Sequence, residues 1–235
     1  MIYNISYNFI FVKPRKVAGT SIEIALSALS DHQTILTPLS KVDEISRKKF
    51  TDFNAQNFNY SPNKNWLRQI KVASKRISKM QRLRYFYNHM TLDEICDAIG
   101  PQHFNTAHKI SVYRPPHDYV ISCYFHYNSS LENFENWYWK NRKHIFSITD
   151  SYNLGSVFHI DFMIDFRDLV GSFSEMIDAK LIGSDVLLDF EHIKTKNNRR
   201  PPQTINVEKF YENYPEIYGD IERNLIIPKK GKIQC

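Results

Sequence analysis

The sequence from Phe9 to Leu29, FIFVKPRKVAGTSIEIALSAL, constrains the fold more than any other part of this chain. The apolar run Phe9 to Val12 precedes Pro14, and such a run is typical of a strand covered on both faces. After a basic turn, Thr20 and Glu23 have the spacing of a capping box, which predicts that Thr20 caps a helix. Apolar residues then recur at helical spacing and should pack against the sheet: Ile22, Ala25, Leu26 and Leu29. The stretch predicts a central strand, a tight turn and an amphipathic helix.

The turn between this strand and this helix is a candidate anion site. Backbone N–H groups and the positive end of the helix dipole attract anions there, and polar side chains flank the turn: Arg15, Lys16, Thr20 and Ser21. Gly19 permits the sharp exit. The stretch lacks the GxxxxGK[ST] phosphate loop, because no lysine follows Gly19 and no glycine stands five residues before it. An ATP or GTP site is therefore disfavoured, and phosphate or sulfate fits better, although many α/β proteins have such a turn without a ligand.

Length and composition favour one large α/β domain over residues 1–235. A chain of 235 residues can bury a substantial core without disulfides or metals. The three cysteines lack the spacing of a disulfide framework or a zinc site: Cys96, Cys123 and Cys235. The first residues contain no basic leader, no membrane-spanning apolar run and no cleavage site, so we expect a soluble, cytoplasmic protein. The formal charge of +6 favours an acidic partner.

Residues 64–84 form a strongly basic segment, with eight lysines and arginines and no acidic residue. Apolar residues recur in it at helical spacing, which predicts a basic helical insertion within about residues 40–87. A charge run is usually a solvated helix face, but such a face normally mixes signs, so the absence of acids favours contact with an anion. A polyanionic glycan could lie along this helix. No nucleic acid is expected, because no nucleic-acid-binding module is recognisable.

Thr91 and Glu94 have the spacing of a second capping box, which predicts a short helix that stops at Gly100-Pro101. His89 falls just before this helix. A histidine in such a place is more often a structural hydrogen-bonding group, but its ordinary pKa near 6.5 also suits a general base. Whether His89 is a structural group or a general base depends on the function that the following segment indicates.

Residues 106–113 read as another strand, and Pro116 suits the first turn of a helix over about residues 117–129. Arg114 then stands at the carboxyl end of a strand, where open α/β sheets place ligand contacts. A guanidinium can hold a phosphate through two hydrogen bonds, and the Ser122 hydroxyl can add a third. Further on, residues 207–225 predict one or two closing helices interrupted at Pro215.

Two separated segments resemble the sulfotransferases that use 3′-phosphoadenosine 5′-phosphosulfate (PAPS). FIFVKPRKVAGTSIE is similar to their 5′-phosphosulfate loop, in which Lys16 matches the loop lysine and Gly19-Thr20-Ser21 matches the GTS element. SVYRPPHDYVISCYFHY is similar to their 3′-phosphate motif, and Arg114 and Ser122 keep its eight-residue spacing. Residues 88–92, NHMTL, resemble the histidine segment of carbohydrate sulfotransferases, and residues 186–193, VLLDFEHI, resemble a strand and FEdL element of the family.

The resemblance implies a P-loop-like three-layer α/β fold, with a central, mainly parallel sheet flanked by helices. It implies PAPS as donor and 3′-phosphoadenosine 5′-phosphate (PAP) as product, with no metal. The implied donor-binding residues are Arg15, Lys16, Ala18, Gly19, Thr20, Ser21, Arg114 and Ser122. Lys16 would neutralise charge at the bridging oxygen, and His89 would take the proton of the acceptor hydroxyl. The acceptor would be a carbohydrate, guided by Arg68, Lys71 and Lys75 of the basic helix if it is anionic; the oligomeric state is not predicted.

Two departures and three alternatives accompany this resemblance. Ala18 stands where the family has glycine, which restricts how closely the backbone approaches a phosphate, and Pro115 stands where Asp or Asn is common. One alternative is a P-loop kinase that holds magnesium through Asp189; others are a polyanion-binding or RNA-binding protein and a catalytically inactive sulfotransferase fold. If His89 is not the base, the next candidates are His108, His117 and His126, which read better as packing residues.

Overall fold

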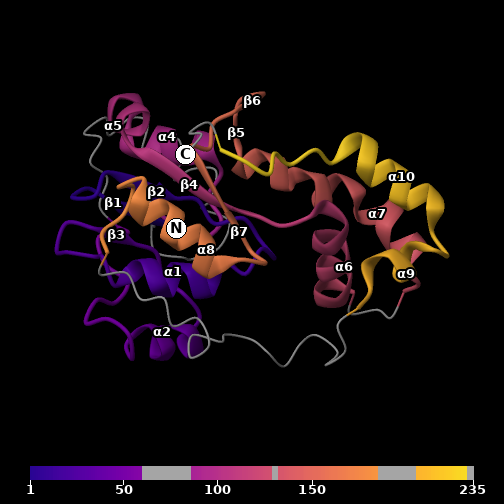
Figure 1. Cartoon of the computed structure of the whole chain (residues 1–235), viewed down its shortest axis with the longest axis horizontal. Coiled ribbons are helices and arrows are strands. Elements are labelled where there is room, and N and C mark those ends of the chain that lie inside the picture. The colour runs from indigo at the N-terminus through magenta and orange to yellow at the C-terminus, as the bar shows by residue number, and fades with distance from the viewer. Residues whose placement is uncertain (60–85, 129–131, 185–204, 232–235) are drawn as a thin grey trace.

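The computed structural model describes residues 1–59, 86–128, 132–184 and 205–231, which form an α/β structure with a mixed five-stranded sheet (Figure 1). The strand order is β3-β1-β2-β4-β7. The bounds of these strands are Ile2–Asn4 for β1, Phe9–Phe11 for β2, Ile35–Leu36 for β3, His108–Tyr113 for β4 and Phe162–Asp165 for β7. A separate two-stranded ribbon joins β5 (Asn153–Leu154) to β6 (Val157–Phe158).

The sheet is half parallel, so the prediction of a mainly parallel sheet is met only in part. The strand β2 pairs in parallel with β4, and β4 pairs in parallel with β7. The strand β1 is antiparallel to both β2 and β3. Only four residues separate β1 from β2, and so short a connection forces a hairpin. Asn8 closes the hairpin at φ 52°, a left-handed conformation that asparagine tolerates.

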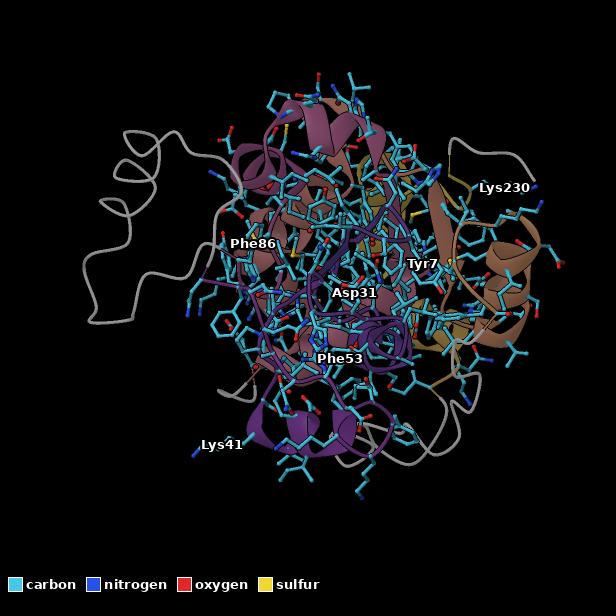
Figure 2. The ribbon with its side chains drawn as sticks, turned by 90° about the vertical axis from the view of Figure 1, so that its left-hand side faces the viewer. Tyr7, Asp31, Lys41, Phe53, Phe86 and Lys230 are labelled. Atoms are coloured by element: carbon cyan, nitrogen blue, oxygen red, sulfur yellow. The ribbon has the colours of Figure 1, made fainter. Side chains whose placement is uncertain are left out.

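Helices flank the sheet on both faces. Figure 1 shows α4 and α5 above the strands and α1 and α2 below them, while α6, α7, α9 and α10 gather to the right. The bounds are Gly19–Ser27 for α1, Lys41–Arg47 for α2, Leu92–Ile99 for α4, Pro101–Thr106 for α5, Pro116–Tyr127 for α6, Phe134–Phe146 for α7, Leu169–Asp178 for α8, Val207–Tyr211 for α9 and Pro215–Asn224 for α10. A 3₁₀ helix, η1, covers Ser147–Ser151. In Figure 2 the side chain of Lys41 extends outward from the start of α2.

The local predictions are largely confirmed. The strand β2 is fully buried at the centre of the sheet, and the apolar stripe of α1 is buried beside it. The capping box at the start of α4 is present, because the Thr91 hydroxyl accepts from the Glu94 N–H and the Glu94 carboxylate accepts from the Thr91 N–H. Pro116 and Pro215 begin helices as expected. The basic segment at 64–84 and the segment 186–193 lie outside the described residues.

The capping box predicted at the start of α1 is wrong. Thr20 lies inside the first turn, and the N-cap is Ala18, which makes no side-chain capping bond and has φ 60°. Gly19 is buried, and a Cβ there would lie 2.8 Å from the Lys13 Cγ. Because glycine has no side chain, Gly19 leaves room for Lys13, and Ala18 adopts the left-handed conformation at the turn. Glu23 is turned inward, where Lys13 meets it.

Candidate functional site

A cavity of about 480 Å³ opens where the loop before α1 meets the end of β4 and the first turns of α6. The strands β2 and β4 are parallel neighbours, so their carboxyl ends reach the same edge of the sheet. All the donor-binding and catalytic residues predicted from the sequence line this cavity: Arg15, Lys16, Ala18, Gly19, Thr20, Ser21, His89, Arg114 and Ser122. Arg68, Lys71 and Lys75 lie outside the described residues. The two motif segments, about 90 residues apart in the sequence, therefore border one space.

The lining of the cavity contains more cations than anions. Its cationic side chains are Lys13, Arg15, Lys16 and Arg114 and its one carboxylate is Asp43, so the lining residues alone count 4 − 1 = +3. Two of these cations have carboxylate partners outside the lining, Lys13 with Glu23 and Arg114 with Asp118. Asp43 is buried and accepts from the Ser40 hydroxyl at 2.7 Å. A concave site with an excess of cations attracts anions from solution. Its volume lies within the range of about 300–1,000 Å³ that is usual for small-molecule sites.

The backbone is strained at this cavity. Three of its lining residues have left-handed backbone angles: Lys16 at φ 62°, Ala18 at φ 60° and His89 at φ 64°. For a residue with a Cβ, this conformation costs about 1–2 kcal/mol. Strain of this kind persists where the surrounding structure enforces it and is concentrated at ligand-binding sites.

Arg114 ties the loop before α1 to α6. Its Nε donates to the Asp118 carboxylate at 2.6 Å, and one terminal nitrogen donates to the Lys16 carbonyl at 2.5 Å. Its guanidinium carbon also lies 4.8 Å from the centre of the Phe166 ring. These contacts fix the guanidinium plane at the cavity wall. Phe166 follows β7 and was not predicted as a site residue, since nothing in its local sequence marks it.

The backbone of Lys13, two residues beyond the end of β2, orients the side chain of His89. Its Nδ1 lies 2.9 Å from the Lys13 carbonyl oxygen. A carbonyl can only accept, so Nδ1 carries the proton and Nε2 carries the lone pair. Burial lowers the pKa of His89 to about 4, with Lys13 and Arg15 among the nearby cations that add to the effect. His89 is therefore neutral at pH 7, and its pKa is not the ordinary value near 6.5 that the sequence led us to expect.

A buried ionic cluster supports the floor of the cavity. The Glu23 carboxylate accepts from the Lys13 Nζ at 2.7 Å, from the Met1 amino group at 3.1 Å and from Arg47 at 3.2 Å. Burial alone would raise the pKa of Glu23, but these cations outweigh it and lower the pKa to about 2. Glu23 thus holds Lys13, whose carbonyl in turn orients His89. Lys13 is a site residue that was not predicted from the sequence. The feature that could have identified it is a charged residue directly after a buried strand.

A second, smaller cavity of about 200 Å³ adjoins the first one. Arg15, His89 and Tyr127 line both cavities, so the two spaces meet at these side chains. Apart from Thr91, the second cavity is otherwise lined by residues of α6, α7 and η1, among them Trp137 and Asn141. It was not predicted, because its lining from α7 and η1 comes from segments that carry no recognisable motif.

The other candidate histidines have different surroundings. His117 stacks on Tyr218 with ring centroids 4.0 Å apart and lies edge-on to Tyr211, as expected for a packing residue. His108 begins β4, and His126 lines the first cavity near the end of α6. Of the histidines lining the first cavity, His89 alone also lines the second.

Comparison of the chain with family models, curated proteins and solved structures found no match. Within the described ranges, no group of three or more His, Cys, Asp and Glu side chains is placed to hold a metal ion. Among the helices of those same ranges, none has the length and apolar character needed to cross a membrane.

Proposed function

We propose that this protein is a sulfotransferase that moves the sulfuryl group of PAPS to a hydroxyl of a carbohydrate acceptor, on a P-loop-like fold. One observation carries the proposal: two motif segments distant in the sequence meet at a single cationic cavity beside the unprotonated Nε2 of His89. The resemblance assigned donor phosphates to the first segment and to Arg114. Their convergence is what a donor with phosphates at both ends of its nucleoside requires.

The residues of the cavity fit such a donor. The left-handed angles at Lys16 and Ala18 turn the backbone between β2 and α1, so that amide groups at the start of α1 can receive a 5′-phosphate. Thr20 and Ser21 line the cavity, as do Arg114, which directly follows β4, and Ser122 on α6. The substitution of Ala18 for glycine does not prevent the left-handed turn.

Each chemical task has a candidate group. When bound, PAPS supplies the sulfuryl group, and PAP is the product. Lys16 would offset the negative charge that develops on the departing phosphate oxygen, as a preorganised cation in a low-dielectric site can. The Nε2 of His89 would take the proton of the acceptor hydroxyl as its oxygen bonds to sulfur. Glu23 and Lys13 act as positioning residues, because they hold the carbonyl that orients His89.

Transfer of [³⁵S]sulfate from labelled PAPS to a mixture of glycans, in the presence of EDTA, tests this proposal. We expect labelled glycan with the wild-type protein and with Lys143→Ala, a variant of an exposed lysine on α7. Lys16→Ala and His89→Ala should lose the transfer. Transfer that survives in His89→Ala at the wild-type rate would remove His89 as the base, and no labelled glycan with the wild-type protein would contradict the proposal.

A further inference from the structure

The second cavity differs from the first one in size and in charge. Its volume of about 200 Å³ falls below the range of about 300–1,000 Å³ that is usual for drug-sized ligands, so it has room for about one ring. Arg15 and Asp150 are its only arginine, lysine or carboxylate side chains among the described residues, and they give a formal charge of 1 − 1 = 0. The first cavity carries +3 by the same count.

The lining of the second cavity combines aromatic residues with hydrogen-bonding groups. Trp137 and Tyr127 contribute rings, and Asn141, Ser147 and Asp150 contribute amide, hydroxyl and carboxylate groups. Asn141 donates to the Trp137 carbonyl at 2.8 Å within α7, which fixes its side chain at this wall. A pyranose ring has one apolar C–H face and a rim of hydroxyls, so it matches such a wall better than a flat phenol does.

We propose that the second cavity is the acceptor subsite and that it takes one uncharged sugar ring. The proposal rests on the proposed function and specifies its acceptor. Arg15, His89 and Tyr127 line both cavities, so a sugar in the second cavity adjoins the anion cavity and can bring one hydroxyl to the imidazole of His89. An in-line transfer needs such direct contact between the acceptor oxygen and the sulfuryl group held in the first cavity. Arg15 and Asp150 offset each other in formal charge, so the second cavity offers a carboxylate no net attraction, and the acceptor ring is neutral even if the rest of the glycan is anionic.

The test is saturation-transfer NMR with small methyl glycosides at millimolar concentration, with and without PAP. The neutral probes are methyl β-D-glucopyranoside, methyl β-D-galactopyranoside and methyl α-D-mannopyranoside, and the charged probe is the uronate of the glucoside. We expect at least one neutral hexoside to bind the PAP-saturated protein about tenfold more tightly than the uronate. Asp150→Asn should narrow this difference, because it keeps the side-chain shape but leaves the positive charge of Arg15 without an offsetting carboxylate in the cavity lining.

Asn141→Phe and Asn136→Phe form a matched pair on α7. Asn141 lines the second cavity, whereas Asn136 is exposed one turn earlier and lines neither cavity. We expect Asn141→Phe to abolish the hexoside signal and to leave PAP binding unchanged, and Asn136→Phe to preserve both. Ser147→Phe, at an exposed position of the cavity wall, provides a second blocking variant if Asn141→Phe does not fold.

Three outcomes would overturn the inference: no hexoside binding with or without PAP, hexoside binding that both blocking variants retain, or tighter binding of the uronate or of 4-methylphenol, which is added as a flat aromatic probe. PAP binding is measured separately in the same samples. A protein that binds PAP but no hexoside refutes the acceptor subsite alone. A protein that binds a hexoside in an Asn141-dependent manner but no PAP refutes the proposed donor instead.

Discussion

Replacement of Glu23 by glutamine tests the buried ionic cluster beneath the site. Glu23 is fully buried and contacts the side-chain cations of Lys13 and Arg47 and the amino group of Met1. Its pKa is lowered from 4.5 to about 2. At 1.36 kcal/mol per unit, the ionised carboxylate stabilises the folded state by about 3 kcal/mol relative to its protonated form. This figure agrees with the loss of about 3–5 kcal/mol that is typical when one partner of a buried ion pair is removed.

We therefore expect Glu23→Gln to lower the free energy of unfolding by about 3 kcal/mol at pH 7. In a chain of this size that loss corresponds to a fall in Tm of about 6–12 °C. Urea unfolding followed by circular dichroism measures the difference. Glu175→Gln, which changes an exposed glutamate on α8, is the matched control and should cost less than about 0.5 kcal/mol.

The contribution of Glu23 to the free energy of unfolding should decrease as the pH falls. Because the folded pKa lies below the unfolded one, the contribution of Glu23 is complete above about pH 4.5 and disappears as the pH falls toward 2. The stability difference between wild type and Glu23→Gln should shrink over that interval. A Glu23→Gln variant as stable as Glu175→Gln at pH 7, or a difference that grows on acidification, would refute the ionic cluster as described.

Three further predictions concern the strained loop and the two catalytic candidates. Ala18→Gly should stabilise the protein by about 0.5–1 kcal/mol, because it relieves a left-handed alanine, while Ala28→Gly, at φ −62°, should destabilise it by a similar amount; equal effects in urea unfolding would contradict the strain. The pKa of His89, about 4 in the ligand-free protein, should rise when PAP binds, since added negative charge favours the imidazolium; ¹⁵N NMR of labelled histidine would show it, and an unchanged or lower pKa would place PAP elsewhere. Lys16→Ala should lower kcat by about 10²-fold or more and leave hexoside binding in the NMR assay unchanged. A loss of hexoside binding would mean that the variant disturbs the acceptor side.

Local signals in the sequence were enough to predict the elements that border the first cavity. The apolar run of β2, the capping box at Thr91 and the proline at the start of α6 each depend on neighbouring residues only. Because β2 and β4 are parallel neighbours, correct local predictions also brought Arg114 close to Lys16. The roles of Arg68, Lys71 and Lys75 stay predictions.

The features that the sequence did not reveal depend on distant partners. Glu23 has the local spacing of a capping residue, but Lys13 and Arg47, ten residues before it and 24 after it, draw it into the interior. Burying an unpaired lysine would cost more than a capping bond gains, so the ion pair prevails. The second cavity could not be predicted for a similar reason. Residues of α7 and η1 become candidate site residues only because the fold places them beside His89.

Calorimetric titration with PAP, without magnesium and with ATP as the control ligand, tests the central claim most directly. We expect PAP to bind the wild type much more tightly than ATP. Arg114→Ala should weaken PAP binding by about 10- to 100-fold, as the loss of a charge-assisted contact does. Arg223→Ala, at an exposed arginine of α10, should leave it unchanged. PAP that does not bind, or that binds equally well to Arg114→Ala, would contradict the account.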